Sequence, residues 1–210
     1  MTDITERLAA IRGLEPVSPN QQKKLDITHL KKGGYLELEG ETWMVKKVYY
    51  YLDVKWSDFS KRKKDYWVCE LEIFSLNTGK TSYLEWEKDD DIEIYLTTDL
   101  VKLRDIKFNG RAIKHEDLVE IAEEEEGDLT VMNTEYAYSD DDTWAALFMK
   151  DKNEVHGIPM RTYEFESDSG LSLSIETWHE DEDERPDREA FLSQPVGKKK
   201  ISILQPQAAS

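Results

Sequence analysis

The chain has 210 residues, of which 39% are hydrophobic, 35% are charged and 10% are aromatic. This composition excludes a disordered acidic polymer, which lacks aromatic residues, and a membrane protein, which needs apolar runs of about 18 residues or more. The single cysteine, Cys69, excludes an intramolecular disulfide and a cysteine-cluster zinc site. Because the first residues lack the apolar core of a signal peptide, we expect a cytoplasmic protein without a transmembrane segment.

The formal charge of −17 is concentrated in the second half of the chain. Residues 1–104 include 17 basic and 19 acidic residues, a net charge of −2. Residues 105–210 include 11 basic and 26 acidic residues, a net charge of −15. Such acidity repels a phosphate backbone, so we expect no direct nucleic-acid binding by that half. Acidic runs are ordinarily solvated loops, and a surface that attracts a cation or a partner protein is the alternative. The candidate residues for that surface are Asp140, Asp141, Asp142, Glu180, Asp181 and Glu182.

A short helix is predicted near the N-terminus, followed by a proline-containing linker that ends at about residue 25. Asp3 can cap the helix and Gly13 ends it, while Ile4, Leu8 and Ile11 share one face. An isolated helix of this length is marginally stable and needs a docking surface. We expect that surface to be the body of the protein itself, with a partner protein as the alternative.

From about residue 26 the pattern changes to the alternation of half-buried antiparallel strands. Residues 35–48 alternate around a turn at Gly40, and a second turn is predicted at Gly79. Further strands are predicted over residues 66–74, 81–87 and 92–96. This spacing of short strands and turns is typical of a small sandwich or barrel.

The second half of the chain repeats part of this pattern. Aligning Gly79 with Gly170 places Leu84 on Ile175 and matches the neighbouring turn residues as well. We therefore predict a mainly β fold with two related antiparallel, barrel- or sandwich-like units in tandem, and coincidence between two ordinary hairpins is the alternative. The predicted segments are the N-terminal helix and linker (1–25), the first unit (26–104), the acidic second unit (105–204) and a tail (205–210).

Residues 115–126 fit two structures. Apolar and polar residues alternate over 115–122 as in a strand, whereas the glutamate-rich continuation favours a helix. We predict a strand, because Gly127 and Asp128 are typical of a turn before the apolar residues that follow.

No pattern of catalytic or metal-binding residues stands out. The histidines lack metal-ligand spacing, and the strongest of them, His179, precedes an acidic run without the glycine turn of a calcium loop. Cys69 lies in a predicted strand, where a buried structural thiol is expected. We expect no metal and no cofactor, and we predict a non-enzymatic binding or adaptor protein. An acidic mimic of nucleic acid is a less favoured alternative.

The most unusual stretch combines aromatic and basic residues. Residues 49–59 contain five aromatic residues, and a run of four basic residues follows at 61–64. We interpret this stretch as a hairpin with a basic tip, suited to an anionic partner such as a protein surface, lipid headgroups at a membrane surface or RNA. The alternative is that the lysines only keep a β edge soluble. The candidate binding residues are Trp56, Lys61, Arg62, Lys63, Lys64 and Trp67.

The order of turn glycines and aromatic residues resembles a known family. The resemblance is carried by Gly34, Gly40 and Trp43, then Leu84-Glu85-Trp86, and later Leu173-Ser174-Ile175-Glu176 with Trp178. Over residues 30–204 the chain is similar to the bacterial family called domain of unknown function 4178. The resemblance implies a mainly β cytoplasmic protein of unassigned activity, associated with polyamine-synthase-like enzymes and with membrane-stress proteins. The resemblance also implies that a cation bound by the acidic surface is a polyamine. The alternative function that it implies is an enzyme of polyamine metabolism.

Overall fold

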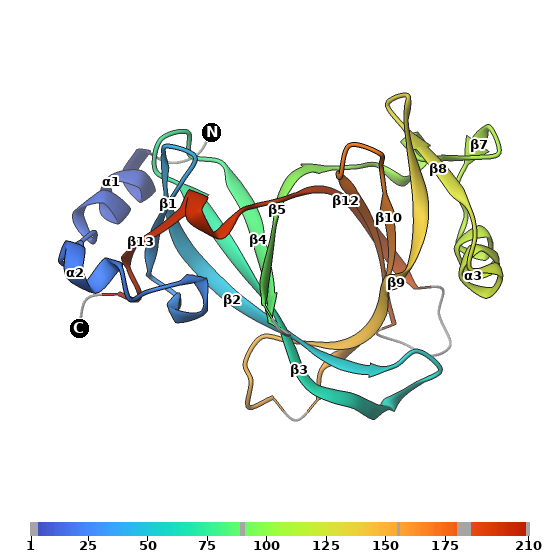
Figure 1. Cartoon of the computed structure of the whole chain (residues 1–210), viewed down its shortest axis with the longest axis horizontal. Helices are drawn as coiled ribbons and strands as arrows, with labels where there is room; N and C mark the ends of the chain where they lie inside the picture. The colour runs from blue at the N-terminus through green and yellow to red at the C-terminus, as the bar shows by residue number, and fades with distance from the viewer. Residues whose placement is uncertain (1–3, 89–90, 155, 180–185, 209–210) are drawn as a thin grey trace. The chain divides into compact units, whose positions relative to one another are not determined.

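The computed structural model describes residues 4–88, 91–154, 156–179 and 186–208, without the side chains of residues 64–67 (Figure 1). Strands predominate among the described residues, so the prediction of a mainly β fold is confirmed. The chain forms two compact units: unit 1 comprises Met1–Tyr50, Val68–Leu96 and Val196–Ser210, and unit 2 comprises Tyr51–Trp67 and Thr97–Pro195. The units therefore alternate along the chain. The duplication predicted for residues 26–104 and 105–204 stays a prediction.

Unit 1 is built on a sheet with the strand order β13-β1-β2-β3-β4-β5, of which β2, β3 and β5 continue into unit 2. Its elements are α1 (Ile4–Arg12), α2 (Pro19–Gln22), the 3₁₀ helix η1 (Ile27–His29), β1 (Tyr35–Leu38), β2 (Glu41–Lys55), β3 (Asp58–Ser75), β4 (Thr81–Lys88), β5 (Ile92–Leu100), η3 (Lys198–Lys200) and β13 (Ile201–Gln205).

One face of this sheet carries the apolar core of unit 1. Leu71 of β3 lies opposite Leu84 of β4, and both side chains are fully buried. The free thiol of Cys69 lies in the same core. Because side chains alternate between the two faces of a strand, Glu72 lies on the other face, where it accepts a hydrogen bond from Lys47 Nζ at 2.8 Å. The period-2 pattern in the sequence thus separates the apolar core from a charged face.

The N-terminal helix α1 docks on unit 1, but not with the face predicted from the sequence. Its Ala10 is buried, and the Tyr35 hydroxyl donates to the Ala10 carbonyl oxygen at 2.7 Å. Arg7 donates to the Leu76 carbonyl oxygen through Nε and Nη2. The small Ala10 and these polar contacts bring the helix to the sheet, so the predicted docking face was wrong. The three apolar residues of the predicted face, Ile4, Leu8 and Ile11, are exposed. The predicted cap, Asp3, lies outside the described residues.

Unit 2 has the strand order β5-β12-β11-β10-β9-β8-β6-β7, and β9 also pairs with β2. Its further elements are η2 (Leu103–Asp105), β6 (Lys107–Phe108), β7 (Arg111–Ala112), α3 (His115–Glu124), β8 (Asp128–Val131), β9 (Thr134–Met149), β10 (Ile158–Glu166), β11 (Ser172–Trp178) and β12 (Asp187–Pro195).

Left-handed residues close several of the hairpins. A two-residue turn with positive φ at both positions matches the right-handed twist of the strands that it joins. The predicted turn at Gly40 is of this kind, with φ of 53° at Glu39 and 81° at Gly40. The same pairing of positive φ values occurs at Asn109-Gly110 and at Met132-Asn133.

The strand predicted for residues 115–126 was wrong, because residues 115–124 form α3. Leu118 and Ile121 lie three residues apart and share the helix face that packs into the core of unit 2. The helix start is fixed by Asp117, whose carboxylate accepts from the Lys114 backbone N–H at 2.8 Å. Two Arg111 nitrogens donate to the same carboxylate at 2.6 Å each. Helical packing and this capping outweigh the alternation that suggested a strand.

We predict that Asp117→Ala destabilises unit 2. The substitution removes the cap of α3 and the partner of Arg111, so the free energy of unfolding should fall by about 2 kcal/mol in urea denaturation. The control is Asp128→Ala, because Asp128 is exposed at the start of β8. Equal effects of the two substitutions would contradict the role given to Asp117.

Candidate functional site

The end of the β2–β3 hairpin is the basic part of unit 2 that the sequence singled out. We call residues 55–63 the basic hairpin. It consists of Lys55 at the end of β2, the turn Trp56-Ser57 and the first residues of β3. Neither turn residue has a positive φ, unlike the residues of the turn at Gly40. A turn of this kind does not match the twist of its strands by itself, so other contacts must hold it.

Arg161 of β10 supplies these contacts. Its Nε and Nη2 groups donate to the Trp56 carbonyl oxygen at 3.2 Å and 3.0 Å. The guanidinium carbon lies 5.2 Å from the centre of the Trp56 ring and 4.6 Å from the centre of the Phe59 ring. Trp56 in turn packs edge-on against Tyr163, with 5.2 Å between the ring centres. Arg161 thereby fixes both the backbone and the aromatic side chains of the basic hairpin.

His179 completes the surroundings of Arg161. Its Nε2 atom lies 3.2 Å from Arg161 Nη1, and its ring lies 5.3 Å from the Phe59 ring. Burial, followed by the nearby positive charge of Arg161, lowers the pKa of His179 to about 4. At neutral pH the imidazole is therefore uncharged, and its Nε2 accepts a hydrogen bond from the guanidinium. Burial also lowers the pKa of Arg161, which nonetheless stays protonated.

The basic hairpin also presents charge to solvent. Lys55, Lys61, Arg62 and Lys63 are all exposed. Hydrogen bonds from Ser60, together with Lys61 Nζ at 2.9 Å, lower the pKa of Asp58 to about 2. An exposed pair of this kind contributes little to stability, because water screens it. The exposed cations are therefore available for contacts outside the chain.

The first residues of β3 also form a strand edge. β4 pairs with β3 over Cys69–Phe74, and β4 ends at Lys88, two residues beyond the partner of Cys69. Its pairing therefore cannot extend to the start of β3, at Asp58. Among the described residues, no strand covers the outer edge of residues 58–63. Such an edge presents backbone N–H and C=O groups that can pair with another strand.

The predicted binding residues are placed differently from the sequence interpretation. The basic run lies within strand β3, so the interpretation as a basic hairpin tip was wrong: the tip is Trp56-Ser57. Trp56 is half-buried against Arg161 and is a structural anchor of the hairpin. The side chains of Lys64 and Trp67 lie outside the described residues.

The predicted acidic site falls partly on strand β9. Asp140, Asp141 and Asp142 lie in β9 where its pairing with β10 shifts register, and all three are exposed. Asp142 accepts a hydrogen bond from Ser139 Oγ at 2.6 Å. The run was predicted to be a loop, and its place in a bulged strand corrects that prediction. Glu180, Asp181 and Glu182 lie outside the described residues.

Sequence reasoning missed Arg161. The local signal is a long cation within the strand Met160-Arg161-Thr162-Tyr163, between buried neighbours. That signal gives no partner, because Trp56 lies 105 residues earlier in the chain. Within the described ranges, no three His, Cys, Asp or Glu side chains are grouped as metal ligands. No helix in those ranges is long and apolar enough to cross a membrane.

Comparison with known families gives one match. A family model described as "Domain of unknown function (DUF4178)" matches residues 31–196. The chain belongs to the DUF4178 family. Neither curated proteins nor solved structures contain a match to it. The resemblance noted in the sequence is thereby confirmed, and the site residues of this DUF4178 protein have to be argued from its own geometry.

We predict that Arg161→Lys loosens the basic hairpin. Lysine retains the charge but loses the planar guanidinium, which stacks on two rings and donates twice to the Trp56 carbonyl oxygen. The free energy of unfolding in urea should fall by about 1–3 kcal/mol. Arg104→Lys is the control, because the Arg104 side chain is 75% exposed. An unchanged stability of the Arg161 variant would contradict the anchoring role.

Proposed function

We propose that this DUF4178 protein is a non-catalytic binding protein that holds an extended acidic segment of a protein partner along the outer edge of β3. The observation that carries the proposal is the exposure of Lys61, Arg62 and Lys63 on a strand edge without a neighbour among the described residues. A segment that adds to such an edge gains affinity from backbone hydrogen bonds and specificity from alternate side chains.

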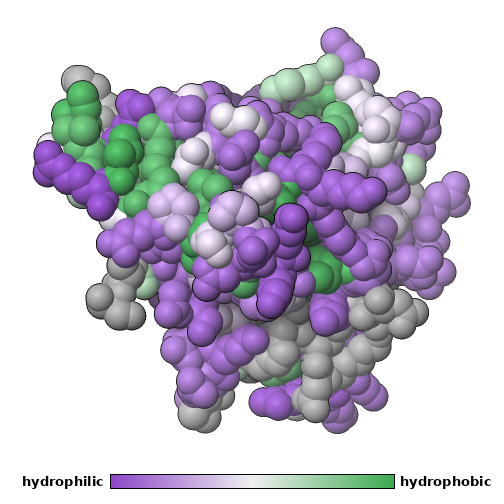
Figure 2. Space-filling model, turned by 60° about the vertical axis from the view of Figure 1, so that its left-hand side comes forward, coloured by the Kyte–Doolittle hydropathy of each residue, from purple (hydrophilic) through white to green (hydrophobic). Residues whose placement is uncertain are grey.

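The charge of the basic hairpin favours an acidic partner. The whole chain carries −17, and the face drawn in Figure 2 is mostly hydrophilic, with hydrophobic side chains gathered at its upper left. An acidic segment is repelled by most of such a protein and attracted to a local cluster of lysine and arginine. Arg62 and Lys63 supply this attraction together with Lys55. Lys61 is already paired with Asp58 and contributes less.

The aromatic residues of the hairpin support a partner that pairs through its backbone. Trp56 and Phe59 are half-buried and pack on Arg161, so one face of each ring is already used within unit 2. Stacking on bases and insertion into a membrane both require free aromatic or apolar side chains. The basic hairpin instead offers charge and backbone groups, which are the features that an extended acidic peptide can use.

Other functions predicted from the sequence stay predictions. Polyamine binding at Asp140, Asp141 and Asp142 is one of them, and the Ser139 contact already occupies one oxygen of Asp142. An enzyme of polyamine metabolism is the other. The link to membrane-stress systems likewise rests on the family resemblance alone.

The proposal predicts that the basic hairpin determines peptide binding. The probe is a fluorescein-labelled peptide of alternating Glu and Thr, measured by anisotropy. Replacing Lys61, Arg62, Lys63 and Lys64 together with Ser should weaken binding at least about tenfold, because the cations and their attraction are lost. The melting temperature should stay nearly unchanged, since exposed charges contribute little to folding.

The matched control replaces four basic residues of unit 1 with Ser, namely Lys23, Lys24, Lys31 and Lys32, which are exposed. This control changes the net charge equally and should bind the peptide with only a small loss. A Glu-Thr peptide with every backbone nitrogen methylated keeps the charge but has no N–H to donate to the edge, and it should bind weakly. Equal losses in both protein variants, or binding of phosphatidylserine vesicles without binding of the peptide, would overturn the proposal.

A further inference from the structure

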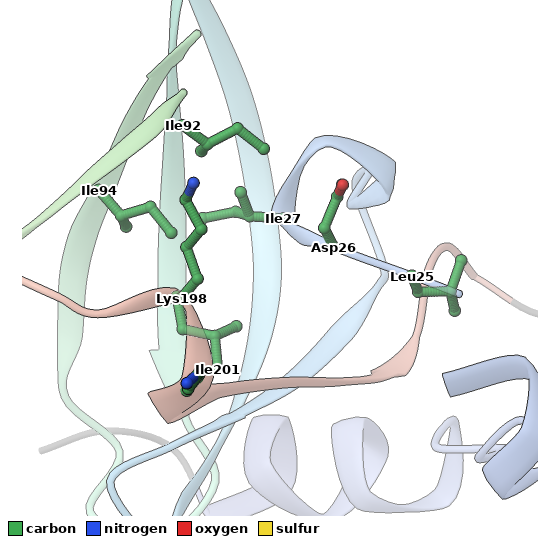
Figure 3. Close-up of a pocket in the computed structure, with 8 residues that line it drawn as sticks. Leu25, Asp26, Ile27, Ile92, Ile94, Lys198 and Ile201 are labelled. Carbon is green, nitrogen blue, oxygen red and sulfur yellow. The ribbon is translucent and has the colours of Figure 1, made fainter. Parts of the chain in front are cut away.

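A pocket of about 230 Å³ opens on unit 1, separate from the basic hairpin (Figure 3). Three segments that are far apart in the sequence line it. They are the residues at the start of η1, the first residues of β5, and η3 with the first residue of β13. Its volume is smaller than the 300–1,000 Å³ or so of pockets for drug-sized ligands, so it selects a small molecule.

The inner wall of the pocket is aliphatic. Ile27 and Ile94 are 2% and 4% exposed and belong to the core of unit 1. Leu25, Ile92 and Ile201 are half-buried around them and pack on the same core. Branched aliphatic side chains on several sides favour a branched aliphatic group of matching size, because burying it removes apolar surface from water.

Charges of both signs stand among these aliphatic residues. Figure 3 shows Lys198 running alongside Ile94 and Ile27 towards Ile92, with Asp26 on the neighbouring segment. Lys198 is paired with Asp91, which precedes Ile92. Lys199 also lines the pocket and is exposed. The pocket thus offers a positive side from η3 and a negative side from Asp26.

The negative side is held in place by the backbone. Asp26 Oδ1 accepts from Thr28 N at 3.0 Å and from Thr28 Oγ1 at 2.6 Å, and His29 Nδ1 lies 2.8 Å from it. These hydrogen bonds lower the pKa of Asp26 although burial opposes them, so the carboxylate is ionised at neutral pH. All three contacts use Oδ1. Oδ2 therefore stays oriented and able to accept from a ligand.

We propose that this pocket binds a small zwitterion with a branched aliphatic body, the chemistry of a free aliphatic amino acid. The ammonium group donates to Asp26 Oδ2, the carboxylate lies towards Lys199 and Lys198, and the side chain packs among Ile27, Ile92 and Ile94. A simple anion gains nothing from Asp26, and a simple cation gains nothing from the lysines. The inference is independent of the proposed function, since no residue of the basic hairpin takes part.

The test is titration of isoleucine-methyl-labelled protein followed by NMR. L-leucine should shift the δ1 methyl signals of Ile27, Ile92, Ile94 and Ile201. The Ile175 methyl, in the core of unit 2, should not move. 4-Methylpentanoate and 3-methylbutylamine have the same aliphatic body but lack the ammonium or the carboxylate, and each should bind at least about tenfold more weakly. Absence of shifts with leucine, or equal binding of either single-charge analogue, would overturn the proposal.

Two substitutions test the assigned contacts. Asp26→Asn retains a residue that caps η1 but removes the charge, so the fold is kept while leucine binding weakens about tenfold. Lys199→Gln should weaken binding in the same direction. Asp168→Asn makes the same change in an exposed turn of unit 2 and should leave leucine binding unchanged. Unchanged affinity in the Asp26 variant, with the fold verified by its methyl spectrum, would show that Asp26 takes no part.

Discussion

The basic hairpin depends on one interaction, the pair of hydrogen bonds from Arg161 to the Trp56 carbonyl oxygen. The turn itself has no left-handed residue, so it lacks the twist that holds the other two-residue turns. Arg161 replaces that local geometry with a contact from a strand 105 residues away. A half-buried guanidinium loses hydration, and the faces of Trp56 and Phe59 together with the neutral His179 offset this cost.

Because of this interaction, the aromatic side chains of the hairpin pack inside unit 2 and its basic side chains are exposed. Trp56 and Phe59 are turned towards Arg161, and the exposed positions carry Lys55, Arg62 and Lys63. A rigid strand edge with exposed cations follows. Lysines on an edge ordinarily prevent pairing with other chains, and the same charges admit a strand whose own charge is opposite. Protection from aggregation and selection of an acidic partner are therefore consistent with each other.

Local patterns predicted the elements that depend on local physics. Alternation predicted the strands on both sides of Gly40, because each strand has one buried face. Helix α3 was mistaken for a strand, since its start is set by the Asp117 carboxylate on the Lys114 backbone N–H rather than by periodicity. The docking face of α1 was predicted wrongly, because the helix is held by hydrogen bonds to backbone oxygens at Leu76 and Ala10. A hydropathy pattern contains no information on such bonds. The Arg161 anchor and the aliphatic pocket were missed for one reason: both join segments that are far apart in the chain.

Backbone amide hydrogen exchange of β3, with and without the acidic Glu-Thr peptide, tests the central claim most directly. Along a strand edge, the outward N–H groups alternate with those that bond the neighbouring strand. We expect the peptide to slow exchange at alternate residues within 58–63 and to leave the strands of unit 1 unaffected. If the exchange rates of residues 58–63 are the same with and without bound peptide, or if only other strands are protected, this edge is not the binding site.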